Sequence, residues 1–379
     1  HGLIFLDLKA EFQVVSWMIK AARQANREND LRLLSLANRD LSVPYNPIKY
    51  GIAPEIHSQI MNSMSWSEDY YRKISSIALM TLLRALCEYR DRTGELFHLG
   101  HLYELLNEPG LLRAFNEKLS TMNCLVSRDV ELLSEKLDRP SERDKLTGLV
   151  ANLGLLIHSA AGGLISEDVK SGSFDFREAI DGGKITYVLM NSMKLRETAS
   201  VFGKMILQDL MRIAGDRYGD IDLDPKQRRP VTLIIDEFAA FAIPEFIEFM
   251  DRARGAGIGI VFAHQSRADL RAVTPEFQDR IEANSNTVIV SGVKSSEDAE
   301  YFAGILGTRT VKKETVQVED GFLGQKRTGM KSIRETEEYV VHPNRIKDLQ
   351  QGEVFTVSRT VDARWAMVKV PQASEFEDQ

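Results

Sequence analysis

The chain has 379 residues, a length beyond which a single hydrophobic core stops growing, so two domains are expected. Its formal net charge of −7 gives no support to a uniformly basic nucleic-acid binder, although an acidic oligomer can still enclose a basic channel. No apolar run approaches the length of a transmembrane helix and no signal peptide is recognised, so we expect a soluble chain, with any membrane anchor upstream of His1.

The first elements are two strands on either side of a helix. Residues 3–8 predict an apolar strand, residues 11–28 have the spacing of an amphipathic helix, and residues 31–36 predict a second strand. Turn chemistry follows over 42–47, because each of its two prolines disfavours a helix at the residue before it. Residues 1–53 are interpreted as the first part of an α/β domain.

Long helical patterns without a convincing strand then extend from residue 54 to residue 166. Helices are predicted over 74–90, from 99 onward, and over 113–122, 130–137 and 142–159. The small residues of 160–164 are interpreted as a return linker. Residues 54–166 are therefore predicted to be an all-α domain inserted into the α/β domain, which resumes and continues over 167–379.

Strands and helices alternate in this last part. Strands are predicted over 184–190, 231–235, 259–263 and 287–292, and helices over 197–216, 244–254, 275–283 and 296–306. Such alternation is typical of right-handed crossovers and a parallel sheet. The segments 310–318, 335–341 and 353–358 alternate apolar and polar residues and predict a hairpin and edge strands.

A glycine-flanked loop, Asp320–Gly324, lies within the predicted hairpin and is expected to be mobile. Five basic residues flank it: Lys312, Lys313, Lys326, Arg327 and Lys331. The simplest interpretation is a solvated face, and the less favoured alternative is a pore-facing loop that contacts DNA.

The run Val231–Ile235 ends in two carboxylates, Asp236 and Glu237. In open α/β sheets ligands bind at the carboxyl ends of the strands, so this pattern favours the Walker B motif of a P-loop NTPase. Asp236 would then hold Mg²⁺ through water, and Glu237 would polarise the water that attacks the γ-phosphate of ATP. Gln265 follows the next apolar run and would sense the γ-phosphate or orient that water. Alternatively, the acids only cap the following helix.

The glycine-rich phosphate loop that should accompany these residues does not occur in the sequence. The chain begins inside an apparent strand, so we interpret it as a fragment that starts just after that loop; the alternative is a degenerate NTPase. Asp7, Lys9 and Glu11 would then lie at the edge of the nucleotide site. They could equally be a solvated strand end with a helix-capping acid.

Two arginines near residue 254 have a similar ambiguity. Arg252 and Arg254 precede a glycine pair, which is typical of favourable charge at a helix C-terminus followed by a glycine cap. The alternative is an arginine finger that reaches the γ-phosphate held by a neighbouring subunit. Arg254 is the preferred candidate.

Together these residues resemble the type IV secretion coupling proteins of the TraD/TraG kind, which are related to the FtsK and HerA motors. The resemblance is carried by five motifs: Leu6-Asp7-Leu8-Lys9-Ala10-Glu11, Tyr45-Asn46-Pro47, Asp236-Glu237, Arg254 through Gln265-Ser266, and Ser296 through Ala303. It covers nearly the whole chain and is sharpest over 231–307. The phosphate loop and membrane anchor are missing, and Ala10 stands where glycine is usual.

The resemblance implies an α/β, RecA-like P-loop NTPase domain with an all-α insertion, binding ATP and Mg²⁺. It also implies a homo-hexamer at the cytoplasmic face of the bacterial inner membrane. This hexamer would bring a relaxase-bound single DNA strand or a protein effector to the type IV secretion channel and couple ATP hydrolysis to its transfer. The alternatives are a double-stranded DNA translocase of the FtsK/HerA type and a non-catalytic interaction module with a degenerate NTPase fold.

Overall fold

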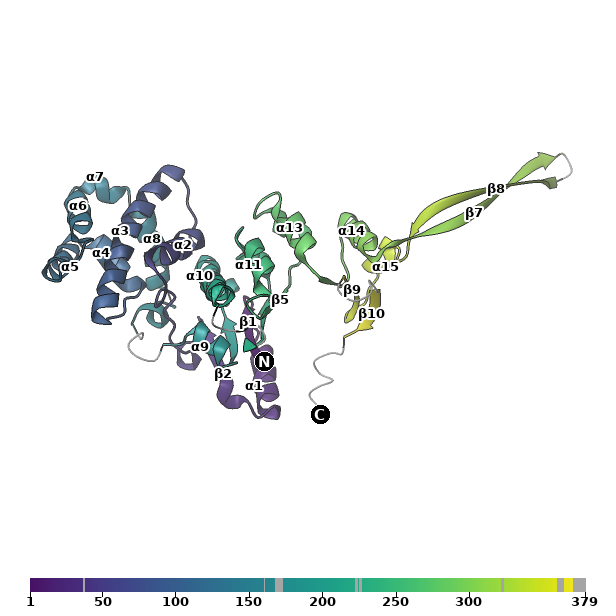
Figure 1. Ribbon diagram of the computed structural model, residues 1–379. Coiled ribbons are helices and arrows are strands. Elements are labelled where there is room, and N and C mark those ends of the chain that lie inside the picture. The colour runs from purple at the N-terminus through teal and green to yellow at the C-terminus, as the bar shows by residue number, and fades with distance from the viewer. Residues whose placement is uncertain are drawn as a thin grey trace. The chain divides into compact units, whose positions relative to one another are not determined.

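The computed structural model describes residues 1–36, 38–159, 161–167, 173–221, 224, 227–321, 324–359 and 365–370. The chain divides into two compact units, His1–Gln278 and Asp279–Gln379 (Figure 1). No helix among the described residues combines the length and the apolar character that a bilayer crossing requires.

A five-stranded parallel sheet forms the centre of the first unit, in the order β2-β3-β1-β4-β5. The strands are β1 (Gly2–Asp7), β2 (Leu31–Ser35), β3 (Ile185–Leu189), β4 (Val231–Ile235) and β5 (Ile258–Phe262). Leu6 is fully buried and is paired with Val188 on β3 and Ile235 on β4. Because all five strands are parallel, their carboxyl ends lie along one edge, and β1 ends between β3 and β4.

The helices outside the helical segment mostly differ in length from the prediction. Four lie between strands of the sheet: α1 (Phe12–Gln24), α9 (Phe176–Asp181), α10 (Ser192–Gly219) and α11 (Phe246–Ala253). Two follow β5: α12 (Arg267–Arg271) and α13 (Phe277–Asn284), which crosses the boundary between the units. The predicted helix over 11–28 is too long, because Asn26 adopts a left-handed φ of 55° and ends the helical path. Helix α10 begins earlier than predicted and is kinked at Arg196.

Between β2 and β3 the described residues form a set of helices, drawn together in Figure 1, with short 3₁₀ and π turns but no named strand. These are α2 (Ala53–Ser63), α3 (Asp69–Thr93), α4 (Leu99–Asn107), α5 (Pro109–Thr121), α6 (Ser127–Leu137), α7 (Pro140–Asp144) and α8 (Thr147–Ile157). The single helix predicted over 142–159 is wrong, because the chain turns between α7 and α8. The buried leucines at 146, 149, 153 and 156 keep helical spacing across that turn and therefore hide it from a sequence pattern.

The two ends of the helical segment meet. Tyr45 and Phe174 form an isolated parallel bridge, and the amide of Tyr45 donates to the carbonyl of Leu164 at 2.9 Å. The segment also contacts the α/β part, since Gln59 on α2 donates to the carbonyl of Met205 on α10 at 3.1 Å. Both parts lie in the same compact unit, and their division into domains at residues 53 and 166 stays a prediction.

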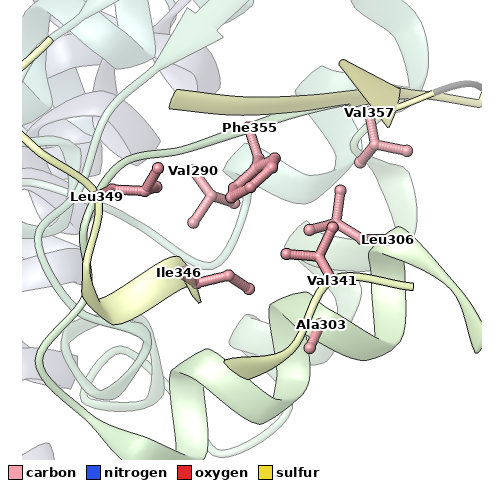
Figure 2. Packing of buried hydrophobic residues seen from close by; sticks show 8 residues of the cluster. All are labelled: Val290, Ala303, Leu306, Val341, Ile346, Leu349, Phe355 and Val357. Atoms are coloured by element: carbon pink, nitrogen blue, oxygen red, sulfur yellow. The ribbon is translucent and has the colours of Figure 1, made fainter. Parts of the chain in front are cut away.

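The second unit contains a three-stranded antiparallel sheet and two helices. Its elements are β6 (Thr287–Val290), α14 (Ser296–Leu306), β7 (Thr308–Gly321), β8 (Gly324–Tyr339), α15 (Pro343–Lys347), β9 (Glu353–Ser358) and β10 (Trp365–Lys369). Figure 2 shows its core of eight buried residues: Val290, Ala303, Leu306, Val341, Ile346, Leu349, Phe355 and Val357. These side chains come from β6, α14, α15, β9 and the connecting segments.

Two expectations for this unit need correction. The strand over 287–292 was counted in the parallel sheet, but β6 pairs antiparallel with β9, and the sheet order is β10-β9-β6. The alternation of strands and helices cannot show this, because the partner strand lies more than 60 residues further along the chain. The predicted hairpin is present, and β8 begins at Gly324, well before the segment 335–341 that was expected to form its strand. Residues 322 and 323 of the predicted mobile loop lie outside the described residues.

Candidate functional site

The carboxyl edge of the parallel sheet brings together side chains that are far apart in the sequence. The ammonium nitrogen of Lys9, just after β1, lies 2.6 Å from Oε1 of Glu237 and 3.8 Å from Oδ2 of Asp236, just after β4. The amide nitrogen of Gln265, three residues after β5, donates to the same Oε1 of Glu237 at 2.6 Å. One carboxylate oxygen is therefore shared by a lysine from one neighbouring strand end and a glutamine from the other.

Backbone geometry directs Glu237 into this cluster. Glu237 adopts a left-handed conformation with φ 52°, which is uncommon for a residue with a side chain and often marks a functional position. Phe238 follows, is fully buried, and packs its ring 4.4 Å from that of Phe246 on α11. The amide of Phe238 also donates to the carbonyl of Ala263 at 2.9 Å, which joins the end of β4 to the end of β5.

Asp7 organises the segment after β1. Its buried carboxylate accepts three successive backbone N–H groups, from Lys9 at 2.8 Å, Ala10 at 2.9 Å and Glu11 at 3.3 Å. The hydroxyl of Tyr187 on β3 donates to Oδ2, the same oxygen that accepts the amide of Glu11. With these partners, the carboxylate of Asp7 fixes the backbone path of the loop that follows β1. The sequence predicts Asp7 at the edge of the site but does not single out Tyr187, whose only signal is a hydroxyl inside an apolar strand that needs a partner when buried.

The contacts shift the pKa of three groups at this edge. The hydrogen bond to Glu237, with the charge of Asp236 beside it, raises the pKa of Lys9 despite partial burial. Burial raises the pKa of Glu237, but the hydrogen bonds from Lys9 and Gln265 outweigh it, so its pKa lies below the usual range. Burial and the bond to Asp7 raise the pKa of Tyr187 far above its usual range, so the hydroxyl stays protonated and donates.

Two predicted site residues lie apart from this cluster. Glu11 is exposed where α1 begins, and its backbone amide bonds to Asp7. Arg254 is exposed just after α11 and before β5, and therefore lies at the amino edge of the sheet, opposite Asp236 and Gln265. Its neighbour Arg252 lies 3.8 Å from Glu248, one turn earlier on α11. Within one subunit, Arg254 does not join the acids.

Two of the five basic residues of the hairpin form ion pairs with the facing strand. Lys312 and Lys313 lie 3.4 Å from Glu335 and 2.7 Å from Glu338 on the facing strand, so their charges are neutralised within the hairpin. The side chains of Lys326, Arg327 and Lys331 lie outside the described residues.

The cluster fits a hydrated magnesium ion. Mg²⁺ in nucleotide sites uses one or two carboxylates and completes its shell with water and substrate phosphates. Asp236 offers a partly exposed carboxylate, and the Lys9 ammonium already stands beside it as a cation. Among the described residues no group of three or more His, Cys, Asp or Glu side chains could enclose a metal.

The five-stranded parallel sheet and its strand order define an α/β protein with a RecA-like fold. Residues 230–351 match the family described as "TraM recognition site of TraD and TraG", which confirms the resemblance to coupling proteins of the TraD/TraG kind. A comparison with curated proteins gave no significant match.

Solved structures share the fold at low sequence identity. The bacterial conjugative coupling protein TrwBdeltaN70 in its unbound form is 12% identical, with a TM-score of 0.64 over 98% of this chain and 84% of that one. The plasmid coupling protein TrwB in complex with ADP and Mg²⁺ is 13% identical, with a TM-score of 0.59 over 98% and 84%. VirB4 of Thermoanaerobacter pseudethanolicus is 12% identical, with a TM-score of 0.52 over 100% and 83%.

Proposed function

We propose that this chain is the ATPase part of a conjugative, type IV secretion coupling protein. The observation that carries the proposal is the meeting of Lys9, Asp236, Glu237 and Gln265 at the carboxyl edge of a RecA-like sheet. The TraD/TraG family match and the fold shared with TrwB, which has been solved with ADP and Mg²⁺, support it.

Four residues at this edge of the sheet have a role in this proposal. Asp236 would hold Mg²⁺ through water, and the ion would supply positive charge that offsets the charge of the nucleotide phosphates. Glu237 polarises the attacking water, and its lowered pKa keeps the carboxylate ionised at neutral pH. Gln265 donates to Glu237 and fixes the side from which that water approaches. Asp7 holds the loop that carries Lys9.

The position of Arg254 favours an assembly. A finger must reach the γ-phosphate, yet Arg254 lies at the edge of the sheet opposite its own subunit's acids. We therefore propose that it serves a neighbouring subunit in a homo-hexamer. A hexamer that surrounds a channel would also reconcile the net charge of −7 with DNA as a substrate.

The proposed partners follow from the family. The matched region is described as a TraM recognition site, which supports a partner in the relaxosome, the DNA–protein complex that is processed for transfer. We propose that the protein recruits relaxase-bound single-stranded DNA or protein effectors to the type IV secretion channel. It would do so at the cytoplasmic face of the inner membrane, held by an N-terminal anchor outside this sequence.

The test is ATP hydrolysis by the full-length protein with Glu237→Gln. Glutamine keeps the shape but loses the charge that polarises water, so hydrolysis should be abolished while ATP binding remains. Glu248→Gln is the matched control, because it removes the same charge from an exposed site on α11 and should leave both properties unchanged.

Other outcomes point to the other candidates. Hydrolysis by Glu237→Gln within a few-fold of the wild type would favour a non-catalytic interaction module. Loss of hydrolysis combined with ATP-driven displacement of a third strand from duplex DNA by the wild type would favour a double-stranded DNA translocase.

A further inference from the structure

The ammonium group of Lys9 occupies the place of a cation between two carboxylates. It lies 2.6 Å from Glu237 and 3.8 Å from Asp236, while its own side chain remains 44% exposed. We infer that Lys9 is the internal counter-ion of the magnesium site, and that Lys9 and Mg²⁺ occupy the two acids alternately. This inference rests on the proposed function in one respect, the assignment of Asp236 as the residue that holds the metal.

The backbone of Lys9 is fixed while its side chain is free to move. Asp7 accepts the amides of Lys9 and of the next two residues, so the loop has a defined path. Within the part of the chain that the structure describes, the polar contacts of this side chain are made by its terminal nitrogen, with Glu237 and Asp236. Release of Lys9 therefore requires rotation about side-chain bonds and leaves the loop and the sheet unchanged.

Electrostatics makes the two cations exclusive. Asp236 and Glu237 are consecutive residues, and without a cation their carboxylates repel one another. One ammonium group relieves part of this repulsion, and a divalent ion relieves more of it. An ammonium group and a divalent ion within a few ångströms of each other repel strongly even at the effective dielectric near a protein surface. Metal binding at Asp236 therefore displaces Lys9.

The exchange has a consequence for Glu237. Lys9 and Gln265 both bond to the same oxygen, Oε1. When Lys9 leaves, Gln265 stays and half of that oxygen's hydrogen-bonding capacity becomes available to water. Lys9 thus acts as a positioning residue that occupies one side of Oε1 of Glu237 until the metal has arrived.

The test measures metal affinity and does not depend on turnover. Binding of Mn²⁺, a spectroscopic substitute for Mg²⁺, is followed by electron paramagnetic resonance in the full-length protein saturated with ADP. Lys9→Ala should tighten Mn²⁺ binding about three- to tenfold, the size of a lost charge-assisted pair at a partly exposed site. Lys9→Gln should tighten it similarly, whereas Lys9→Arg keeps the charge and should remain within about twofold of the wild type.

Lys194 supplies the matched control. It is exposed in the first turn of α10, just beyond the carboxyl end of β3, and its side chain makes no ion pair with the described residues. Lys194→Ala removes the same charge from the same edge of the sheet and should leave Mn²⁺ affinity unchanged. If it tightened binding as much as Lys9→Ala, the effect would be one of general charge and the inference would be overturned.

Asp236→Ala separates this inference from the proposed function. If Asp236→Ala binds Mn²⁺ as the wild type does, the assignment of the metal residue fails. If Asp236→Ala loses affinity but Lys9→Ala and Lys9→Gln bind Mn²⁺ no more tightly than the wild type, the assignment stands and the counter-ion role of Lys9 is refuted. The counter-ion role also requires that Lys9→Ala has no effect in the Asp236→Ala background.

Discussion

The hydroxyl of Tyr187 on β3 donates a hydrogen bond to the buried carboxylate of Asp7 on β1. The two residues are 180 positions apart, and the whole helical segment lies between them in the sequence. The contact joins neighbouring strands at their carboxyl ends, and Asp7 in turn holds the backbone from Lys9 to Glu11. The path of the loop after β1 therefore depends on β3, which lies about 180 residues further along the sequence.

Tyr187→Phe should destabilise the protein by about 1–3 kcal/mol, since a buried carboxylate loses one of its donors. Chemical denaturation measures the change in the free energy of unfolding. Tyr89→Phe is the control, because its hydroxyl bonds to Glu95 at an exposed site and its loss should cost about 0.5 kcal/mol or less. Equal losses of unfolding free energy in the two variants would show that the bond to Asp7 stabilises the protein no more than an exposed hydrogen bond does.

Ala10→Gly should stabilise the protein. Ala10 adopts a left-handed conformation with φ 59°, which costs a residue with a Cβ about 1 kcal/mol relative to glycine. Ala21→Gly, at an exposed position inside α1, should instead destabilise by about 1 kcal/mol. Thermal unfolding of the two variants should therefore give shifts of opposite sign, and a lowered midpoint for Ala10→Gly would contradict the loop conformation.

Arg254→Ala should leave ATP binding by an isolated subunit unchanged and reduce the assembly-stimulated rate by about 10³-fold, since a finger in trans stabilises only the transition state. Arg254→Lys should recover little, because a point charge cannot reproduce the planar guanidinium. Mixing Arg254→Ala with Glu237→Gln subunits should restore part of the rate, because some interfaces then combine an intact acid with an intact arginine. No rescue at any ratio, with a normal hexamer, would place the arginine's role inside its own subunit.

The helical segment should lose stability in mild acid. His98 at the start of α4 accepts the amide of Gly100 and stacks on His101 at 3.8 Å. Burial, helped by the neighbouring His101, lowers the pKa of His98 from 6.5 to about 4. The folded state favours the neutral ring, so this stability is present above the unfolded pKa of 6.5 and is lost as the pH falls towards 4.

Unfolding free energies measured by denaturation between pH 7 and pH 4 check this prediction. The wild type should lose about 2 kcal/mol from this group over that range, and His98→Asn, which keeps a capping acceptor but does not titrate there, should lose less. The pH profile of His57→Asn serves as a second comparison. Burial also lowers the pKa of the His57 imidazole, but this ring bonds to Ser76 and not to a backbone amide at a helix start. An identical pH profile for the wild type and His98→Asn would refute the assignment.

Much of the fold was predictable because its strands are short apolar runs that are buried in a parallel sheet. Strand β4, its two acids and the glutamine after β5 could be placed at one edge, since parallel strands end on the same side. Helix α14 was predicted over 296–306, as observed, because Ser295 caps it and Gly307 follows it.

Other features depend on contacts that no local pattern encodes. The antiparallel pairing of β6 with β9 is set by a distant partner strand, and the left-handed turns at Ala10 and Glu237 run against the preference of both residues. The contact of Lys9 with Glu237 requires the register of β1 against β4 and the wrapping of the loop around Asp7. Motif spacing could place Lys9 near the site, but could not indicate which group it meets.

The bridge between Tyr45 and Phe174 has an evolutionary consequence. The chain leaves for the helical segment and returns from it at two adjacent points, and the segment also contacts α10 through Gln59 on α2. Such an arrangement allows a lineage to replace or enlarge its helices while the strands that carry Asp7, Asp236 and Gln265 keep their register. Under the proposed function, the helices that would help to select the substrate could then change while the strands that would bind the nucleotide stay the same.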